Sequence, residues 1–379
     1  MKKIFPTLVI LLFIIFQSCS TKSFKQDIII NTPLVGFTDK VDSIVISKMN
    51  QYNIPGLSIG LVKNDSILYA KGYGIKSIEK DDPVTGASIF HTASVSKLFT
   101  AVAIMKLIKE KAISIDDKLV EVLPELKYDD KRAENITIKT LLNHTSGIPD
   151  ISNYHWDNNN QSETSLQEYV LGLNLELDSD PSKTYHYSNL AYDILGHVIE
   201  KKSGSDFDGF LKKNILDESG MYNSDFRYFK INDSLKTSPH SKRWVTNNIY
   251  KRKTYPYTRE HAPSSTLNSS SKDLSNWMIW FLQTLNDSES IHHSMIKPSF
   301  NSNPNIGLGF QLSTINSKKV IGHYGGDKGF RSYLMMIPEE NLGLVLLANC
   351  DYDEDFRQEI IHAIAALMLT INEDLKNVK

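Results

Sequence analysis

Residues 94–108 read SVSKLFTAVAIMKLI. The apolar residues of this stretch recur at helical spacing over a wide stripe, which predicts a helix buried on most sides with Ser94 at its N-terminus. Residues three apart share a helix face, so the Lys97 amine can reach the Ser94 hydroxyl. A serine hydroxyl becomes a useful nucleophile when a base takes its proton. The stretch therefore predicts a nucleophile and its base, with a simple N-cap serine as the alternative.

The S-x-x-K pattern alone is not specific, because it occurs three more times in the chain. The other copies lie in a charged turn, at the cap of another helix and in a loop: Ser77 to Lys80, Ser269 to Lys272 and Ser294 to Lys297. Only the copy at Ser94 opens an apolar helix, where unpaired backbone N–H groups and the helix dipole favour developing negative charge.

Length and composition indicate an ordinary globular protein. The 379 residues suggest two lobes or one domain with an insertion, and 41% hydrophobic residues can form a sizeable core. The net charge of −2 shows no excess of positive charge that would indicate nucleic-acid binding. The histidines show no metal-ligand spacing and the glycines form no phosphate-binding loop, so we expect no metal and no cofactor.

The N-terminus is typical of a targeting segment. Lys2 and Lys3 precede an apolar run, Leu8 to Phe16, that is too short to span a bilayer. The following Gln17-Ser18-Cys19 resembles a bacterial lipoprotein processing site, so residues 1–18 are a predicted signal peptide, Cys19 a lipidated first residue and 19–33 a tether. An ordinary signal peptide cut nearby is the alternative. The resulting expectation is an exported protein of the cell envelope, periplasmic or on the outer membrane, held to the membrane by lipid. Cys350 ends an apolar run and is expected to be a core residue without a disulfide.

Predicted strands lie near both ends of the chain and predicted helices lie between them. This order predicts an α+β fold, with an antiparallel sheet built from N- and C-terminal segments, flanked by helices, and an inserted helical lobe. We expect one domain over residues 34–374, with a sheet lobe at about 34–93 and 300–374 and a helical lobe at about 94–299. The polar stretch from Asn232 to Arg259 is expected to be a loop.

Two further stretches carry candidate site residues. Tyr187-Ser188-Asn189 precedes a predicted helix, where a phenol can shuttle a proton and an amide can both donate and accept hydrogen bonds. A buried tyrosine followed by an N-cap asparagine is the alternative.

The second stretch, His323-Tyr324-Gly325-Gly326, ends a predicted strand at a glycine-rich turn. There the N–H of Gly326, paired with that of Ser94, can form an oxyanion hole, although an ordinary hairpin turn is the alternative.

Taken in this order, the stretches resemble the serine β-lactamase and penicillin-binding-protein superfamily, in its class C-like branch. S-x-x-K matches Ser94 and Lys97, Y-x-N matches Tyr187 and Asn189, and the third motif, H-x-G, matches His323 and Gly325. The branch's H-T-S-G loop appears at residues 144–147, and the likeness extends from about Val41 to Leu369.

The resemblance implies that Lys97 and Tyr187 deprotonate Ser94, which attacks an ester, amide or lactam carbonyl. It also implies that Asn189 orients Lys97 and the substrate amide, with the N–H groups of Ser94 and Gly326 as oxyanion hole. It implies small-molecule ester, peptide or β-lactam substrates and no obligate protein partner. His323 departs from the lysine usual in β-lactamases, which favours esters or peptides over substrates with a carboxylate. A non-hydrolytic β-lactam-binding or peptidoglycan-sensing protein on the same fold is the alternative function.

Overall fold

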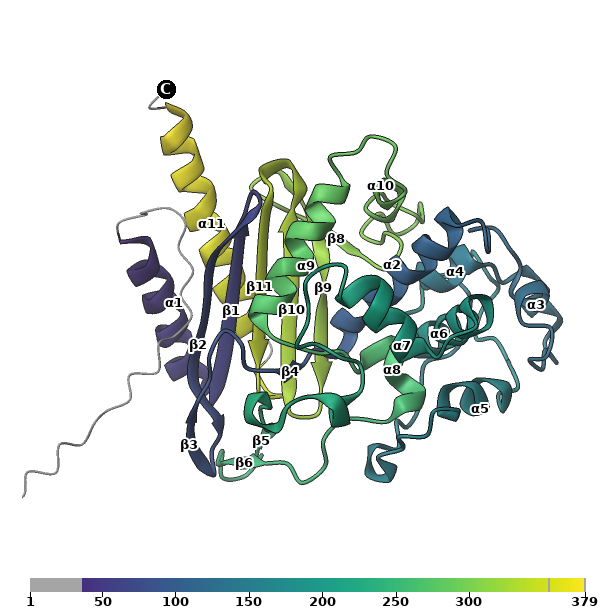
Figure 1. Ribbon diagram of the computed structural model, residues 1–379, viewed down its shortest axis with the longest axis horizontal. Helices are drawn as coiled ribbons and strands as arrows, with labels where there is room; N and C mark the ends of the chain where they lie inside the picture. Colours follow the sequence, from purple (N-terminus) through teal and green to yellow (C-terminus); the bar gives the residue numbers. More distant parts are fainter. Residues whose placement is uncertain (1–35, 354, 378–379) are drawn as a thin grey trace, which may run out of the picture.

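The computed structural model describes residues 36–353 and 355–377, and an antiparallel sheet of seven strands runs through its centre (Figure 1). The strand order is β3-β2-β1-β11-β10-β9-β8. The strands are β1 (Gly56–Lys63), β2 (Ser66–Ser77), β3 (Lys80–Pro83), β8 (Gln311–Ile315), β9 (Lys318–Asp327), β10 (Phe330–Ile337) and β11 (Leu342–Ala348). Segments from both ends of the chain thus form one sheet, which confirms the predicted α+β fold.

The pairing of β1 with β11 joins the two halves of the sheet. Leu57 lies opposite Ala348, and Lys63 lies opposite Leu342. Every residue of β11 is buried, because helices cover both faces of the sheet. Its side chains alternate between two hydrophobic cores, as the period of two in a strand requires: Leu346 faces one core and Leu347 the other.

Helices α1 (Phe37–Tyr52) and α11 (Phe356–Asn377) pack together over one face of the sheet (Figure 1). The buried side chains of α1 recur every four residues, which places them on one helix face: Phe37, Val41, Val45 and Met49.

Helix α9 (Ser271–Thr284) covers the opposite face and contacts β1, β2 and β11. The approach is close at Gly60 of β1, where a Cβ atom would lie 2.4 Å from Ser275 Oγ and 2.7 Å from the Ser271 carbonyl oxygen. The sequence placed these residues in the inserted helical lobe, but by its contacts α9 belongs with the sheet.

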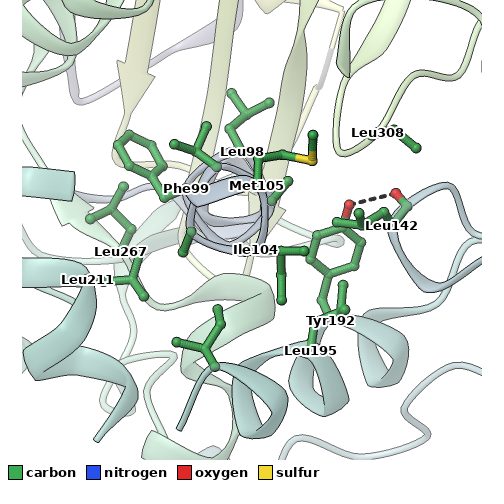
Figure 2. Packing of buried hydrophobic residues seen from close by; sticks show 14 of the residues in the cluster. Leu98, Phe99, Ile104, Met105, Leu142, Tyr192, Leu195, Leu211, Leu267 and Leu308 are labelled. Atoms are coloured by element: carbon green, nitrogen blue, oxygen red, sulfur yellow. Dashed lines mark hydrogen bonds between the residues drawn. The ribbon is translucent and has the colours of Figure 1, made fainter. Parts of the chain in front are cut away.

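Helix α2 (Ser96–Lys109) is the centre of the helical part, and nearly all its side chains are buried. Figure 2 shows Leu98, Phe99, Ile104 and Met105 of α2 surrounded by side chains from other elements. Helix α2 contacts α6 (Asn189–Ser203), α7 (Phe207–Leu211) and α8 (Ala262–Ser265). Other helices of this part are α3 (Leu119–Val122), α4 (Ile138–Leu142), α5 (Ser165–Leu171) and α10 (His292–Met295).

Two short strand pairs lie outside the central sheet. Short strand pairs are formed by β4 (Phe90–His91) with β7 (Asn268–Ser269), and by β5 (His240–Lys242) with β6 (Ile249–Lys251). The expectation of an uninterrupted loop at 232–259 was therefore wrong, because residues 240–251 form a hairpin.

The predicted signal peptide, Cys19 and the tether lie outside the described residues. Among the described helices, none combines the length and apolarity needed to cross a membrane.

Candidate active site

Ser94 lies in a 3₁₀ turn, Ala93–Val95, between β4 and the start of α2. Ala93 adopts a left-handed backbone, with φ of 49°, a conformation that costs free energy for a residue with a side chain. Hydrogen bonds hold the turn on both sides: Ser96 Oγ donates to the Ala93 carbonyl at 2.6 Å, and Ser332 Oγ donates to the Thr92 carbonyl at 2.7 Å. The helix begins after Ser94 rather than at it, so Ser94 is presented by a fixed, strained turn.

The amine of Lys97 is fully buried between three oxygen atoms. Its Nζ lies 3.1 Å from Ser94 Oγ, 2.5 Å from Asn189 Oδ1 and 2.7 Å from the Ser264 carbonyl oxygen. Burial lowers the pKa of Lys97 to about 8, and the charges of the nearby carboxylates, Asp193 first, oppose this shift. An ammonium group loses water's solvation when it is buried, which favours the neutral amine.

Tyr187 reaches the same place from the segment before α6. Its ring stacks on His144, with 4.4 Å between ring centroids, and lies 5.1 Å from Lys97 Nζ. Burial raises the pKa of the Tyr187 phenol, and its hydrogen bond with Ser94 opposes that rise. The raised pKa favours the protonated phenol, which can relay a proton. The H-T-S-G loop supports this arrangement, because His144 Nδ1 accepts the backbone N–H of Ser188 at 3.1 Å.

Asp150 is a site residue that sequence reasoning missed. Both of its carboxylate oxygens accept from Asn189 Nδ2, at 3.0 and 3.1 Å, and one also accepts the Asn189 backbone N–H at 2.7 Å. These bonds point the amide nitrogen of Asn189 at Asp150, and consequently the amide oxygen at Lys97. The only sequence signal was a carboxylate directly after the H-T-S-G-I-P loop.

The open edge of β9 forms the other side of the site. β8 pairs with β9 only as far as Gly322, which lies opposite Gln311. The next N–H that points to this edge, that of Tyr324, donates to Gln311 Oε1 at 3.1 Å. Strand alternation turns the N–H of Gly326, two residues on, to the same edge. Gly325 allows the close approach, since a Cβ there would lie 2.3 Å from the Thr92 carbonyl oxygen and 3.3 Å from the Ser94 nitrogen.

His323 is buried and neutral. Its Nδ1 lies 2.5 Å from the Tyr324 carbonyl oxygen, which can only accept, so Nδ1 carries the proton. Burial, followed by the charge of Lys97, lowers the pKa of His323 to about 3. The neutral ring leaves Nε2 as a hydrogen-bond acceptor, and it supplies no positive charge to the site.

The structure thus brings together the seven residues that the sequence selected around the serine: Ser94, Lys97, Tyr187, Asn189, His323, Gly325 and Gly326. Cys19 lies outside the described residues. Cys350 is free and buried, and burial raises the pKa of its thiol to about 12, which argues against a nucleophilic role. Within residues 36–353 and 355–377, no group of three or more histidine, cysteine or acidic side chains is arranged to hold a metal ion.

Replacing Asp150 tests its role as the anchor of Asn189. In Asp150→Ala the amide of Asn189 loses its carboxylate partner, and we expect labelling of Ser94 by a fluorophosphonate probe to slow by roughly 10- to 100-fold, the usual value of hydrogen bonds to a charged group. Asp157→Ala is the matched control, because that carboxylate lies in the same loop but accepts from Thr254. Equal labelling rates for the two variants would remove Asp150 from the site.

Comparisons with known proteins show what this chain is similar to. Protein flp of Staphylococcus aureus strain MW2 is 27% identical over 319 residues, which cover 82% of this chain and 62% of flp. Penicillin-binding protein 4* of Bacillus subtilis strain 168 is 27% identical over 314 residues, covering 78% of this chain and 68% of that protein. The chain therefore spans somewhat under two thirds of the length of flp.

Solved structures share the fold. The octameric penicillin-binding protein homologue from Pyrococcus abyssi superposes with a TM-score of 0.75 at 26% identity, over 88% of this chain and 77% of that one. A class C β-lactamase from Rhodobacter sphaeroides gives a TM-score of 0.69 at 18% identity, over 87% and 99%, and this likeness is one of fold alone. A family model described as Beta-lactamase matches residues 41–368, so the chain belongs to the β-lactamase family.

Proposed function

We propose that this protein is a serine hydrolase that cleaves ester or amide bonds through an acyl-serine intermediate. The observation that carries the proposal is the buried Lys97 amine, 3.1 Å from Ser94 Oγ. With a pKa of about 8, roughly a tenth of the lysine is neutral at pH 7, against roughly 0.03% at the ordinary lysine pKa of 10.5. This enrichment of a few hundredfold makes Lys97 a usable general base.

In the acylation step, Lys97 takes the Ser94 proton, directly or through Tyr187, as Ser94 Oγ attacks the substrate carbonyl. The carbonyl oxygen becomes an oxyanion, which the N–H groups of Ser94 and Gly326 stabilise. Tyr187 then passes a proton to the leaving alcohol or amine as the carbonyl–heteroatom bond breaks, and it recovers a proton from the Lys97 ammonium, which becomes a neutral amine again. The phenol suits this role because burial keeps it protonated.

Deacylation repeats these steps with water as the nucleophile. A water molecule gives its proton to the Tyr187–Lys97 pair and attacks the acyl carbonyl, and Ser94 leaves with a proton returned from that pair. Asn189 and Asp150 keep the lysine aligned in both steps.

The substrate class follows from the charge of the site. A lysine at position 323 would offer a fixed positive charge to a substrate carboxylate, whereas neutral His323 offers an acceptor nitrogen. We therefore propose esters or peptides without a carboxylate at this position as the main substrates, with β-lactams as lesser ones. A β-lactam-binding or peptidoglycan-sensing role without turnover is the second candidate, and it requires a stable acyl-serine.

The pH dependence of Ser94 labelling tests the base. Lys97 acts in its deprotonated form, so the labelling rate should rise with pH and level off above about 8. Lys97→Ala should lose several orders of magnitude in rate, and Ser94→Ala should not be labelled at all. A loss below tenfold in Lys97→Ala would contradict its role as base, and retained labelling in Ser94→Ala would end the assignment.

A panel of p-nitrophenyl acetate, a chromogenic cephalosporin and a D-Ala-D-Ala peptide tests the substrate class. We expect acetate ester hydrolysis to dominate in the native protein. His323→Lys should raise kcat/KM for the cephalosporin and the D-Ala-D-Ala peptide about tenfold relative to kcat/KM for the acetate ester. Hydrolysis of the acetate ester also shows whether the variant is folded. An unchanged ratio would show that His323 does not determine the preference between these substrates. Stable acylation without turnover would favour the β-lactam-binding or peptidoglycan-sensing role.

We also propose export and lipid attachment at Cys19, supported by the charged and apolar N-terminal pattern. Metabolic labelling with a radioactive fatty acid should mark the native protein, and Cys19→Ala should lose the label. A labelled Cys19→Ala variant would place the lipid elsewhere, and an unlabelled native protein would indicate an ordinary signal peptide.

A further inference from the structure

The β5–β6 hairpin carries two adjacent exposed apolar side chains at its tip. Trp244 is 93% exposed and Val245 is 82% exposed, more than any other large apolar side chain in the described part of the chain. Single exposed apolar residues are common on protein surfaces. An adjacent pair at the end of a projecting hairpin, one of them an indole almost wholly in water, is less ordinary.

The hairpin also lies in a strongly basic segment. Residues 234–259 contain seven lysines and arginines and no aspartate or glutamate, in a chain whose net charge is −2: Lys236, Lys242, Arg243, Lys251, Arg252, Lys253 and Arg259. Near the tip, Arg243 lies over the ring of Tyr250, 5.2 Å from its centroid. Among the described residues, neither Arg243 nor Lys253 has a carboxylate within 4.0 Å.

Acidic residues of neighbouring elements fix the base of the hairpin. Lys242 pairs with Asp353, and Lys251 pairs with Glu79. The guanidinium of Arg252 lies 3.6 Å from Asp351. These pairs neutralise the base and hold the hairpin in place. Of the two cations without a carboxylate partner, Arg243 lies in the turn at the tip, and Lys253 lies just beyond Arg252 at the base.

The turn between β2 and β3 lies beside the hairpin. The backbone N–H of Ile78 donates to His240 Nε2 at 3.2 Å, and the Ile78 side chain is 39% exposed. Lys80, the first residue of β3, follows this turn. Figure 1 shows β3, β5 and β6 at the same end of the molecule. We call this end, formed by Ile78, Lys80 and residues 242–253, the hairpin face.

We propose that the hairpin face docks onto an anionic lipid bilayer, with Trp244 and Val245 entering the headgroup region. Tryptophan favours this region because its ring is apolar while its N–H can still hydrogen-bond. Lysine and arginine next to such an insertion are attracted by the negative surface potential of anionic lipids. This contact is separate from a lipid at Cys19 and independent of the proposed hydrolysis.

Two other partners fit the observations less well. A stable protein partner needs roughly 800 Å² on each side, which two apolar side chains at a tip cannot supply. A soluble polyanion would be attracted by the cations, but it offers no apolar medium for Val245. The bilayer accommodates both features.

Tryptophan quenching by brominated lipid localises the contact. The full chain carrying Cys19→Ser is mixed with vesicles of brominated phosphatidylcholine and phosphatidylglycerol, or of brominated phosphatidylcholine alone. We expect quenching with the anionic vesicles, and we expect Trp244→Phe to lose most of it. Quenching that is unchanged in Trp244→Phe would overturn the proposal, because another part of the chain would then be the one inserted.

Binding measurements with matched variants complete the test. Trp244→Ser with Val245→Ser should weaken binding to anionic vesicles at least tenfold, and Arg243→Gln with Lys253→Gln should reduce its salt dependence. Tyr222→Ser is the control, since Tyr222 is 72% exposed outside the hairpin face. Unfolding temperatures should match across all variants. Equal vesicle binding by the Trp244/Val245 variant and the control would overturn the proposal, as would binding of polyphosphate without vesicle quenching.

Discussion

The burial of the Lys97 amine is the constraint on which the site depends. A lysine in this position is tolerable only if every N–H finds an oxygen, and Ser94, Asn189 and the Ser264 carbonyl provide three. Each of these oxygens comes from a different part of the helical region, so the helices must pack correctly before the amine is satisfied. The apolar surroundings of α2 therefore contribute to the chemistry, because they exclude the water that would hold the pKa of Lys97 at its ordinary value.

Apart from the Lys97 amine, the site offers negative charge mainly backbone dipoles. His323 and His144 are both neutral, since burial lowers the pKa of each ring. Carboxylates lie around the site instead, with Asp150 on Asn189 and Asp327 at 2.7 Å from His91. In the proposed mechanism, a developing oxyanion is stabilised by the N–H groups of Ser94 and Gly326, which are held by the strained turn and by the strand edge.

Side-chain motifs made part of this site predictable. Ser94, Lys97 and Tyr187 could be selected because a hydroxyl, an amine and a phenol in recognisable contexts already imply proton transfer. The Ser264 carbonyl could not, because every residue has one and only the fold decides which carbonyl faces the amine. Asp150 had no pattern of its own, and its role appears only once Asn189 is placed beside it.

The fold was likewise predictable from the sequence only in part. Alternating apolar residues predicted the strands at both ends of the chain. The packing of α9 on the sheet could not be predicted, because the pattern of an amphipathic helix identifies its buried face but not the element that covers this face. The β5–β6 hairpin was missed because its strands are short and their outward side chains are polar.

The pairing of Leu57 with Ala348 has a consequence for how the chain folds. The centre of the sheet cannot form until nearly the whole chain is available, and closing a loop of this length costs about 5 kcal/mol of chain entropy. Such long-range pairing slows folding and leaves the early strands without their final partner during synthesis. Under the export proposed for this protein, late closure of the sheet would keep the chain unfolded until its last strands had crossed the membrane.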